Sequence, residues 1–429
     1  MNILLLGSGG REHAFAWKIV QSSDCSLLYI APGNAGTAEI ATNVDLGIND
    51  FAEIRAFIVA KKIGLVVVGP EEPLVKGITD DLKYHEETCD VPVVGPSQLA
   101  ATLEGSKDFS KRFMQRNNIP TASYATFKAN ELEAGIAYLE TQNLPIVLKA
   151  DGLAAGKGVL ICQTLQEAKD SLKEMLVDKK FGVASSKVVI EEFLTGIELS
   201  VFVATDGNTY KILPEAKDYK RIGEGDTGLN TGGMGAVSPV IFADEAFMKK
   251  VDDLVVKPTV EGLVKENIDY KGFIFIGLMN LDGEPKVIEY NVRMGDPETE
   301  AVLPRIESDF LGLLHAIGTG TLSSYELKIS PKYATTVVMV SGGYPGSYEK
   351  GFTISLPESN ESSMIFHAGT IRNEVGELTN HGGRVIAVTG TGNNLQESLQ
   401  NAYSTVEKIS WENSNFRKDI GLDILKLTN

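Results

Sequence analysis

The chain has few cysteines and no long apolar run, and each of these two shortages argues against a class of protein. It has 429 residues, with three cysteines and two tryptophans. Cys25, Cys89 and Cys162 are odd in number and widely spaced, and no Cys-x-x-Cys pair suggests a zinc or redox site. No apolar run reaches the roughly 18 residues of a membrane span, and the short run before Gly7 has no basic leader. We therefore expect reduced thiols and a cytoplasmic protein.

Positive charge is also scarce. The sequence has 40 Lys and Arg against 57 Asp and Glu, a net charge of −17 at pH 7. An acidic surface repels a polyanion, which argues against non-specific nucleic-acid binding. His85, His315, His367 and His381 lack metal-ligand spacing, and we expect them to be structural. The 43% hydrophobic fraction suffices for several cores, so two to four domains are expected.

A glycine-rich segment with two lysines follows an apolar run of strand length. Lys149 ends the run at 145–148, and the loop continues through Lys157 to Gly158. Glycines let backbone N–H groups approach an anion, and lysines oppose the charge of phosphate oxygens. The Walker pattern is absent because Val159 follows Gly158, so another class of ATP site is predicted. For this segment alone, a flexible hairpin with two solvated lysines is an equal alternative.

A second segment favours the phosphate interpretation. Strand alternation over 286–291 places Glu289 and Asn291 on one face, which offers two oxygen ligands to a hard cation such as magnesium. Asp296 and Glu298 follow, with Arg293 between the two acidic groups. The alternative is a surface strand with ordinary salt bridges.

The first hundred residues alternate short strands with helices. Strands are predicted at 2–6, 27–30, 65–68 and 91–94, and helices near 12–21, 51–62 and 97–104, which is typical of a parallel α/β domain. The glycines after the first strand are similar to a dinucleotide fingerprint, but Glu12 stands where the third glycine belongs, so nicotinamide binding is disfavoured. The loop still suits a phosphate at a helix N-terminus, with a tight turn without ligand as the alternative.

Farther along, helices are predicted at 164–177 and 244–267. The polar, glycine-rich connection 218–239 is longer than ordinary loops and is predicted to close over substrates. Strands at 334–340 and 384–389 and a helix near 395–408 indicate a small α+β domain.

In order and spacing, these blocks make the chain resemble the phosphoribosylamine–glycine ligase family, ATP-grasp enzymes of purine biosynthesis. The resemblance rests on blocks at 7–14, 31–37, 68–71, 104–107, 149–158, 191–194, 226–236, 293–298, 342–346, 366–370 and 382–385. Two departures stand out from the family pattern. Met294 and Glu300 replace Phe and Gln of one block, and Ala216, Lys217 and Tyr219 replace Ser, Gln and His of another.

The resemblance implies an α/β protein with three parts. These are an N-terminal Rossmann-like substrate-binding domain at 1–104, an ATP-grasp domain at 105–325 with a lid at roughly 120–195, and a C-terminal α+β domain at 326–429. The implied reaction joins glycine to 5-phosphoribosylamine through glycyl phosphate, with ATP and Mg²⁺ or Mn²⁺. The partners would be these small molecules, without nucleic acid or membrane, and a monomer is expected.

The resemblance also implies the site residues. The nucleotide would contact Lys107, Lys149, Gly156, Lys157, Glu191, Glu192, Phe193, Leu194 and Glu198. The other substrates would contact Gly9, Gly10, Arg11, Asp218, Lys220, Arg221, Arg293, Gly295, Asp296 and Pro297. Arg293, Asp296 and Lys149 would be catalytic, with Asp296 orienting the substrate amine or Arg293, and Glu289 and Asn291 would bind the metal.

Three other interpretations stay open. A different ATP-grasp ligase, which carboxylates or formylates a purine intermediate, would share the nucleotide site but lack the Gly-Gly-Met-Gly and Arg-x-Gly-Asp-Pro-Glu segments. A nicotinamide-dependent oxidoreductase conflicts with Glu12, Lys149 and Glu289. A catalytically silent nucleotide sensor would not need an intact set of substrate loops.

Overall fold

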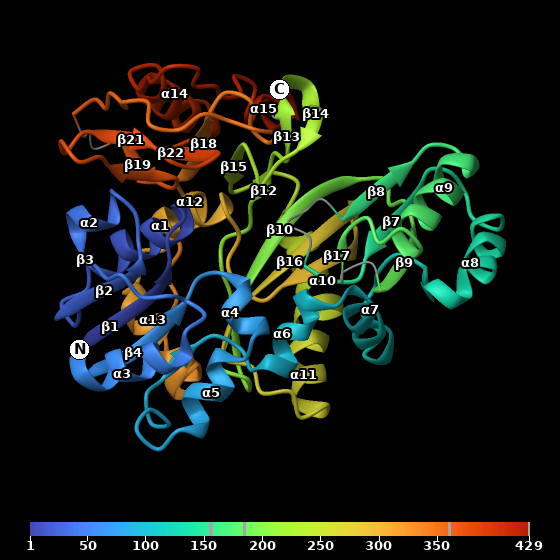
Figure 1. The fold of residues 1–429 in the computed structure, drawn as a ribbon, viewed down its shortest axis with the longest axis horizontal. Coiled ribbons are helices and arrows are strands. Elements are labelled where there is room, and N and C mark those ends of the chain that lie inside the picture. Colours follow the sequence, from blue (N-terminus) through green and yellow to red (C-terminus); the bar gives the residue numbers. More distant parts are fainter. Residues whose placement is uncertain (154–157, 183–185, 359–361, 428–429) are drawn as a thin grey trace.

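The computed structural model describes residues 1–153, 158–182, 186–358 and 362–427. Three lobes surround a central space, with the N-terminal lobe in blue, the central lobe in teal to yellow and the C-terminal lobe in orange to red (Figure 1). The predicted phosphate-loop residues Gly156 and Lys157 lie outside the described residues.

The N-terminal lobe is a parallel five-stranded sheet in the order β3-β2-β1-β4-β5. Its strands are β1 (Asn2–Gly7), β2 (Leu27–Pro32), β3 (Thr42–Asn43), β4 (Ile63–Val68) and β5 (Val93–Val94). Its helices are α1 (Gly10–Ile19), α2 (Thr37–Ile40), α3 (Phe51–Lys61), α4 (Glu71–Val75), α5 (Ile78–Tyr84) and α6 (Gln98–Gly105). Residues 3–7 of β1 are all buried, as expected of a central parallel strand. The predicted parallel α/β fold is confirmed.

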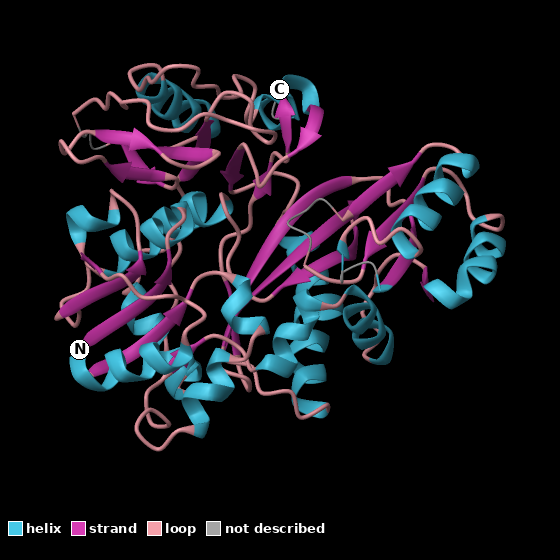
Figure 2. Cartoon of the chain, viewed as in Figure 1, coloured by secondary structure: helices cyan, strands magenta, loops and turns pink. Residues whose placement is uncertain are grey.

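The central lobe contains two antiparallel sheets (Figure 2). The lid sheet has the order β6-β9-β7-β8 and is formed by β6 (Tyr124–Lys128), β7 (Ile146–Ala150), β8 (Val159–Cys162) and β9 (Lys187–Glu192). Helices α8 (Leu132–Leu139) and α9 (Leu165–Leu176) pack on it and share its apolar core, which is separate from the main core of the protein. The segment predicted to be a lid therefore has a core of its own.

The second central sheet has the order β11-β10-β16-β17. Its strands are β10 (Ile197–Thr205), β11 (Tyr210–Ile212), β16 (Gly272–Leu281) and β17 (Glu284–Asn291). The accompanying helices are α7 (Lys107–Arg116), α10 (Glu245–Val251) and α11 (Lys257–Lys265), with a π-helical turn at Asp252–Val256 joining the last two. Helix α13 (Phe310–Thr319) leaves this lobe and packs on the N-terminal one, where the rings of Phe310 and Phe15 stack 5.6 Å apart.

The C-terminal sheet includes strands from far earlier in the chain. Its order is β12-β15-β18-β22-β19, with β12 (Lys217–Asp218), β15 (Gly235–Ser238), β18 (Tyr333–Val340), β19 (Ser363–His367) and β22 (Arg384–Gly392). A small hairpin, β13 (Arg221–Gly223) and β14 (Thr227–Asn230), lies between β12 and β15. The segment 218–239, predicted to be a connection, therefore contains most of four short strands. Within the described ranges, three of them pair only within this region, and β15 also pairs with β18.

The remaining elements complete this lobe. They are α12 (Glu298–Val302), β20 (Thr370–Arg372), β21 (Leu378–Asn380), α14 (Leu395–Val406) and α15 (Leu422–Leu427). The main apolar core runs without a break through the N-terminal sheet, the second central sheet and the C-terminal sheet. In the described part of the chain, no helix is long and apolar enough to span a membrane.

Candidate active site

A cavity of about 1340 Å³ lies between the lobes and gathers most of the predicted site residues. Its lining includes Gly9, Arg11, Lys107, Lys149, Glu191, Glu192, Phe193, Leu194, Glu198, Asp218, Lys220, Arg221, Glu289, Asn291, Arg293, Gly295 and Asp296. Of the other predicted residues within the described ranges, Gly10 and Pro297 are adjacent in sequence to lining residues. Lys149 and Glu289, which are 140 positions apart in sequence, thus line the same cavity.

Lys149, near the end of β7, lines the cavity and is held in place by two partners. Its ammonium group lies 3.0 Å from Oε2 of Glu191 and donates to the carbonyl of Ile288 at 3.2 Å. The same Glu191 oxygen accepts from Lys111, also at 3.0 Å, while its Oε1 has no hydrogen-bond partner among the described residues. Burial lowers the pKa of Lys111 to about 8. Besides its predicted place in the adenine hinge, Glu191 therefore aligns two lysines.

The glycine loop begins against the N-terminus of α7. Oδ1 of Asp151 accepts from the Asp108 backbone N–H at 3.0 Å and from the Ser106 hydroxyl at 2.8 Å. Lys107 donates to the carbonyl of Gly152 at 3.0 Å. These bonds satisfy a helix end and tie the phosphate-loop segment to it.

The predicted adenine hinge leaves β9 at the wall of the cavity. Leu194 is buried, and the partly exposed Phe193 lies beside it. Glu192 also lines the cavity and pairs with Lys286 at 3.1 Å. The apolar wall is extended by Val147, Ile161, Met279 and Ile288, which suits a flat aromatic base.

Glu289 and Asn291 both line the cavity from β17, as the alternation predicted. Among the described residues, the Glu289 carboxylate makes no hydrogen bond or ion pair. Burial raises its pKa, but the cations of Lys220, Lys149, Lys107 and Arg293 outweigh that effect and lower the pKa below its ordinary value. An ionised carboxylate without a bonded partner suits a divalent cation that takes its other ligands from phosphate and water.

Asn291 accepts from Arg293 at 3.3 Å through Oδ1, which has a second lone pair for a metal. No cluster of three or more His, Cys, Asp or Glu suited to a metal occurs in the described ranges. The donor set therefore fits a metal shared with a nucleotide rather than one held by protein alone.

Arg293 is held by two carboxylates from the N-terminal lobe. Its Nη2 lies 3.0 Å from Glu104 and its Nε lies 3.4 Å from Glu71. Glu104 also accepts from the Val292 backbone N–H at 2.8 Å. Asp296 was one predicted partner for Arg293, but the structure gives that contact to Glu104 and Glu71, because Asp296 turns to the C-terminal lobe.

Asp296 pairs with Arg384 of β22 at 3.0 Å, and the same guanidinium donates to the carbonyl of Asp296 at 2.8 Å. Glu300, the departure on α12, is fully buried, and neither carboxylate oxygen has a hydrogen-bond partner among the described residues. Burial and then Asp296 raise its pKa well above the ordinary value. A side chain at Gly10 would clash with Glu300, so glycine is required there by close approach.

The predicted phosphate contacts at the start of α1 already have protein partners. The Gly9 N–H donates to Oε2 of Glu12 at 2.6 Å, and Nε of Arg11 donates to Oε1 of the same side chain at 2.7 Å. Arg11 also donates to the carbonyl of Met294 at 3.0 Å. Glu12 thus occupies the anion position of a dinucleotide fingerprint, which is a structural argument against nicotinamide binding.

A buried acidic pair faces the same cavity from the C-terminal side. Lys220 forms ion pairs with Glu198 and Asp218. Burial and then the Asp218 carboxylate raise the pKa of Glu298 to about 7. Gly295 lies so close that a side chain there would meet Glu298. The Arg221 carbonyl accepts a hydrogen bond from Arg417 of the C-terminal lobe, and the Arg221 side chain donates to the carbonyl of Gly228.

Sequence reasoning gave no role to Glu12, Glu104, Glu298 or Arg384. No periodicity or spacing in the sequence marks Glu104 or Glu298 as site residues. Only the structure shows that Glu104 is buried beside Arg293 and that Glu298 is buried beside Asp218. Glu12 carried one usable signal, because a carboxylate three residues after a helix N-cap can accept the N-cap backbone N–H, as Glu12 does from Gly9.

Three family models together match most of the chain. The phosphoribosylglycinamide synthetase N domain matches residues 1–104, the ATP-grasp (A) domain of that synthetase matches residues 105–299, and its C domain matches residues 334–423.

Known proteins agree with these matches. The chain is 46% identical to phosphoribosylamine–glycine ligase of Vibrio cholerae over 426 residues, and 46% identical to that of Agrobacterium fabrum over 422, in both cases over 98% of each chain. The crystal structure of phosphoribosylamine–glycine ligase from Thermotoga maritima, 35% identical, superposes with a TM-score of 0.85 over 98% of this chain and 100% of that one. A biotin carboxylase domain from Hydrogenobacter thermophilus, 16% identical, has the same fold with a TM-score of 0.74 over 100% of this chain and 94% of that one. The predicted resemblance is confirmed, and the chain belongs to the phosphoribosylglycinamide synthetase family of ATP-grasp enzymes.

Proposed function

We propose that this enzyme joins glycine to 5-phosphoribosylamine, with ATP converted to ADP and phosphate. The observation that carries the proposal is the Glu289 carboxylate, which faces the cavity without a bonded partner among the described residues and is surrounded by Lys107, Lys149, Lys220 and Arg293. A site of this kind neutralises phosphate charge and shares a cation with it. The names of the relatives support the choice of substrates.

The nucleotide would lie along the central lobe. Its adenine would contact the apolar wall at Phe193 and Leu194, and Lys107 and Lys149 would oppose the charge of its phosphates, together with Gly156 and Lys157 of the loop. A bound divalent metal, Mg²⁺ or Mn²⁺ on Glu289 and Asn291, would further neutralise phosphate charge.

The first step would form an acyl phosphate. A carboxylate oxygen of glycine bonds to the γ-phosphorus, the bond from that phosphorus to the bridging oxygen of ADP breaks, and ADP leaves. Arg293, held rigidly by Glu104 and Glu71, is in position to stabilise the charge on the transferring group. No side-chain nucleophile takes part.

The second step would form the amide. The amine nitrogen of phosphoribosylamine bonds to the carbonyl carbon of glycyl phosphate, the carbon–oxygen bond to phosphate breaks, and the amine loses one proton. Glu298, with a pKa of about 7 beside Asp218, is suited to accept that proton. Closure of the lid would protect the acyl phosphate from water.

The test is ADP release by the purified protein with ATP, Mg²⁺, glycine and freshly generated phosphoribosylamine, each omitted in turn. We expect ADP only with the complete mixture, together with an equal amount of glycinamide ribonucleotide. ATP binding without turnover by any amino acid or amine would overturn the substrate assignment and leave the fold assignment intact.

A further inference from the structure

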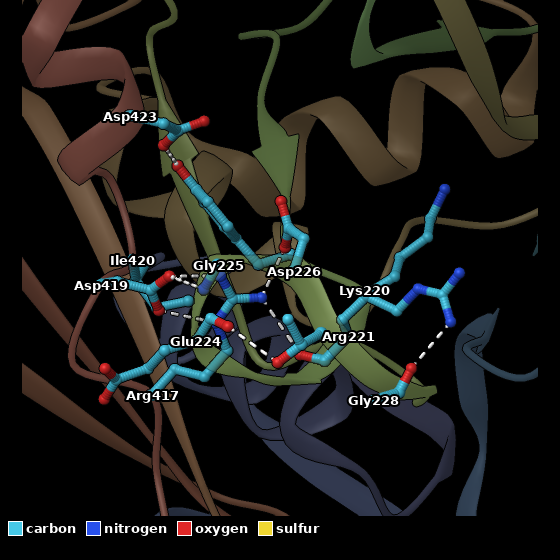
Figure 3. Close-up of polar contacts among 12 residues, drawn as sticks. Lys220, Arg221, Glu224, Gly225, Asp226, Gly228, Arg417, Asp419, Ile420 and Asp423 are labelled. Atoms are coloured by element: carbon cyan, nitrogen blue, oxygen red, sulfur yellow. Dashed lines mark hydrogen bonds and ion pairs between the residues drawn. The ribbon is translucent and has the colours of Figure 1, made fainter.

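The last residues of the chain return to the substrate side of the cavity. Arg417, whose side chain is 2% exposed, lies between Asp419 and Asp226 (Figure 3). It donates to the two Asp419 oxygens at 2.8 and 2.7 Å, to Oδ1 of Asp226 at 2.6 Å and to the Arg221 carbonyl at 3.1 Å. Asp419 also accepts from the Gly225 N–H at 2.8 Å. One guanidinium therefore ties the C-terminal segment to β13 and to the turn of the β13–β14 hairpin.

A second set of bonds joins the C-terminal segment to Lys217 of β12 and to Tyr219, which follows that strand. The Asp423 carboxylate accepts from the Tyr219 hydroxyl and lies 3.0 Å from the ammonium of Lys217. The Gly421 N–H donates to the same hydroxyl at 2.9 Å. Lys217 lies 3.7 Å from the centre of the Tyr219 ring, and the Arg417 guanidinium lies 5.3 Å from it. Two of the residues that depart from the family pattern thus contact the C-terminal segment.

These bonds lie beside the residues that line the cavity, and three of the bonded residues, Lys217, Asp226 and Asp423, line it as well. Tyr219 is buried toward the C-terminal lobe, while its neighbours Asp218 and Lys220 line the cavity. The Lys220 side chain extends away from Arg417, as Figure 3 shows. The backbone at Arg221 is fixed by Arg417, and the carbonyl of Lys220 accepts from Thr231 at 2.8 Å.

We propose that Arg417, Asp419 and Asp423, here called the C-terminal clamp, are positioning residues that hold segment 217–226 so that Asp218, Lys220 and Arg221 face the substrates. The clamp touches none of the predicted nucleotide contacts on β7, β9 and β17. Among the described residues, the segment that it holds reaches the predicted nucleotide contact Glu198 of β10 only through Lys220. Loss of the clamp should therefore affect glycine and the amine more than ATP. The identity of these two substrates rests on the proposed function.

The kinetic test compares Arg417→Lys and Asp423→Ala with the wild type while each substrate is varied in turn. Arg417→Lys keeps the charge but loses the two-pronged contact with Asp419. We expect kcat/KM for glycine and the amine to fall about tenfold, with the KM for ATP unchanged within about twofold. A proportional change for all three substrates, as a general loss of folded protein would give, overturns the proposal, as do unchanged kinetics.

A matched control exists in the central lobe. The Tyr210 hydroxyl donates to Asp252 at 2.6 Å, and neither residue lines the cavity. Asp252→Ala therefore removes a carboxylate from a tyrosine as Asp423→Ala does, and it should leave all kinetic constants unchanged. In addition, Tyr219→Phe combined with Asp423→Ala should lower kcat/KM by less than the product of the two single effects, because the residues act as one unit.

A second measurement needs no substrate. Trypsin cleaves after Lys220 and Arg221 only when that backbone is released, so Arg417→Lys should speed cleavage there about tenfold, as followed by mass spectrometry. Asp252→Ala should not. If the wild type does not use glycine and the amine, the proposed function is wrong. The rate of trypsin cleavage then tests by itself whether the C-terminal clamp holds segment 217–226. Unchanged cleavage, or faster cleavage with wild-type kinetics, overturns it.

Discussion

Individual charged residues in this protein act through the groups that surround them. Glu289 stays ionised although it is half-buried, because four cations face it. Glu298 is more deeply buried, and burial, followed by the neighbouring Asp218 carboxylate, raises its pKa to about 7. Two glutamates nine positions apart therefore have opposite pKa shifts and suit different chemical work, metal binding and proton transfer.

Glu289→Ala should lower turnover by about 10³-fold or more, since it removes the only anionic ligand of the proposed metal pair. ADP release at increasing Mg²⁺ measures the effect, and circular dichroism should show an unchanged fold. Glu284→Ala is the control, because Glu284 lies on the same strand but is exposed and pairs with Lys250 at 2.6 Å. Near-normal turnover of Glu289→Ala at saturating Mg²⁺ would refute the metal assignment.

The pH dependence of the reaction should report the acidic pair. If Glu298 accepts the proton of the amine, kcat/KM rises as pH increases through about 7, where the carboxylate becomes ionised. The apparent value belongs to Glu298 and Asp218 together. Glu298→Gln should abolish the rise and lower kcat about 10²-fold or more. A pH profile that keeps the same rise in this variant would exclude Glu298 as its source.

At the scale of elements, the site is built where strand and helix ends meet. Lys149 is the last residue but one of β7, Asn291 ends β17 two residues after Glu289, and α7 begins at Lys107. Asp151 joins two of these elements, because it belongs to the glycine loop but caps α7. One carboxylate therefore couples the cap of α7 to the loop that is predicted to bind phosphate.

Asp151→Ala should destabilise the protein by about 1 kcal/mol, as loss of a helix cap does, and should weaken ATP binding as well because Lys107 and the loop lose their anchor. Thermal unfolding and calorimetric titration with ATP measure the two effects. Ser97→Ala is the matched control, since Ser97 caps α6 by accepting from the Ala100 N–H at 3.2 Å, away from the loop. Equal ATP affinity in both variants would show that the cap does not serve the nucleotide site.

At the scale of the whole molecule, the three lobes meet through buried contacts. His13 of α1 accepts the backbone N–H of His367 at 2.8 Å through Nδ1, and thereby joins the N-terminal and C-terminal lobes. Burial lowers the pKa of His13 to about 3 and that of His367 to about 4. Both imidazoles are therefore neutral in the folded protein, in agreement with the structural role predicted for His367.

This pair should make stability depend on pH in the acid range. The unfolded histidines take up protons near pH 6.5 and the folded ones do not, so stability is full above about 6.5 and falls as the pH falls toward 4. His13→Asn keeps an acceptor near the position of Nδ1 but cannot titrate, and it should flatten this dependence. Unfolding in denaturant between pH 4.5 and 7.5 measures it, and an equally steep loss in the variant would contradict the argument.

Local patterns were sufficient for β1, β2, β4, β5, α1, α3 and α6 of the N-terminal lobe, but not for its short elements β3, α2, α4 and α5. They were also sufficient for Lys149 near a strand end and for Glu289 and Asn291 on one strand face. The reason is that periodicity and turn residues are read from near neighbours in the sequence. The segment 218–239 was predicted as a connection because its strands are short and polar. One of them, β15, pairs with β18, about 100 positions later, and no local signal reports such a pairing.

The sequence by itself therefore determined the family, the parallel N-terminal sheet, and the residue types available for phosphate and metal. Only the tertiary structure decided that Glu104 and Glu71 hold Arg293, that Glu12 caps the loop at Gly9, and that the C-terminal segment contacts Tyr219. The physical reason is that ion pairs and burial depend on distance in space. Residues that are far apart in sequence acquire their partners and their pKa values only when the lobes pack together.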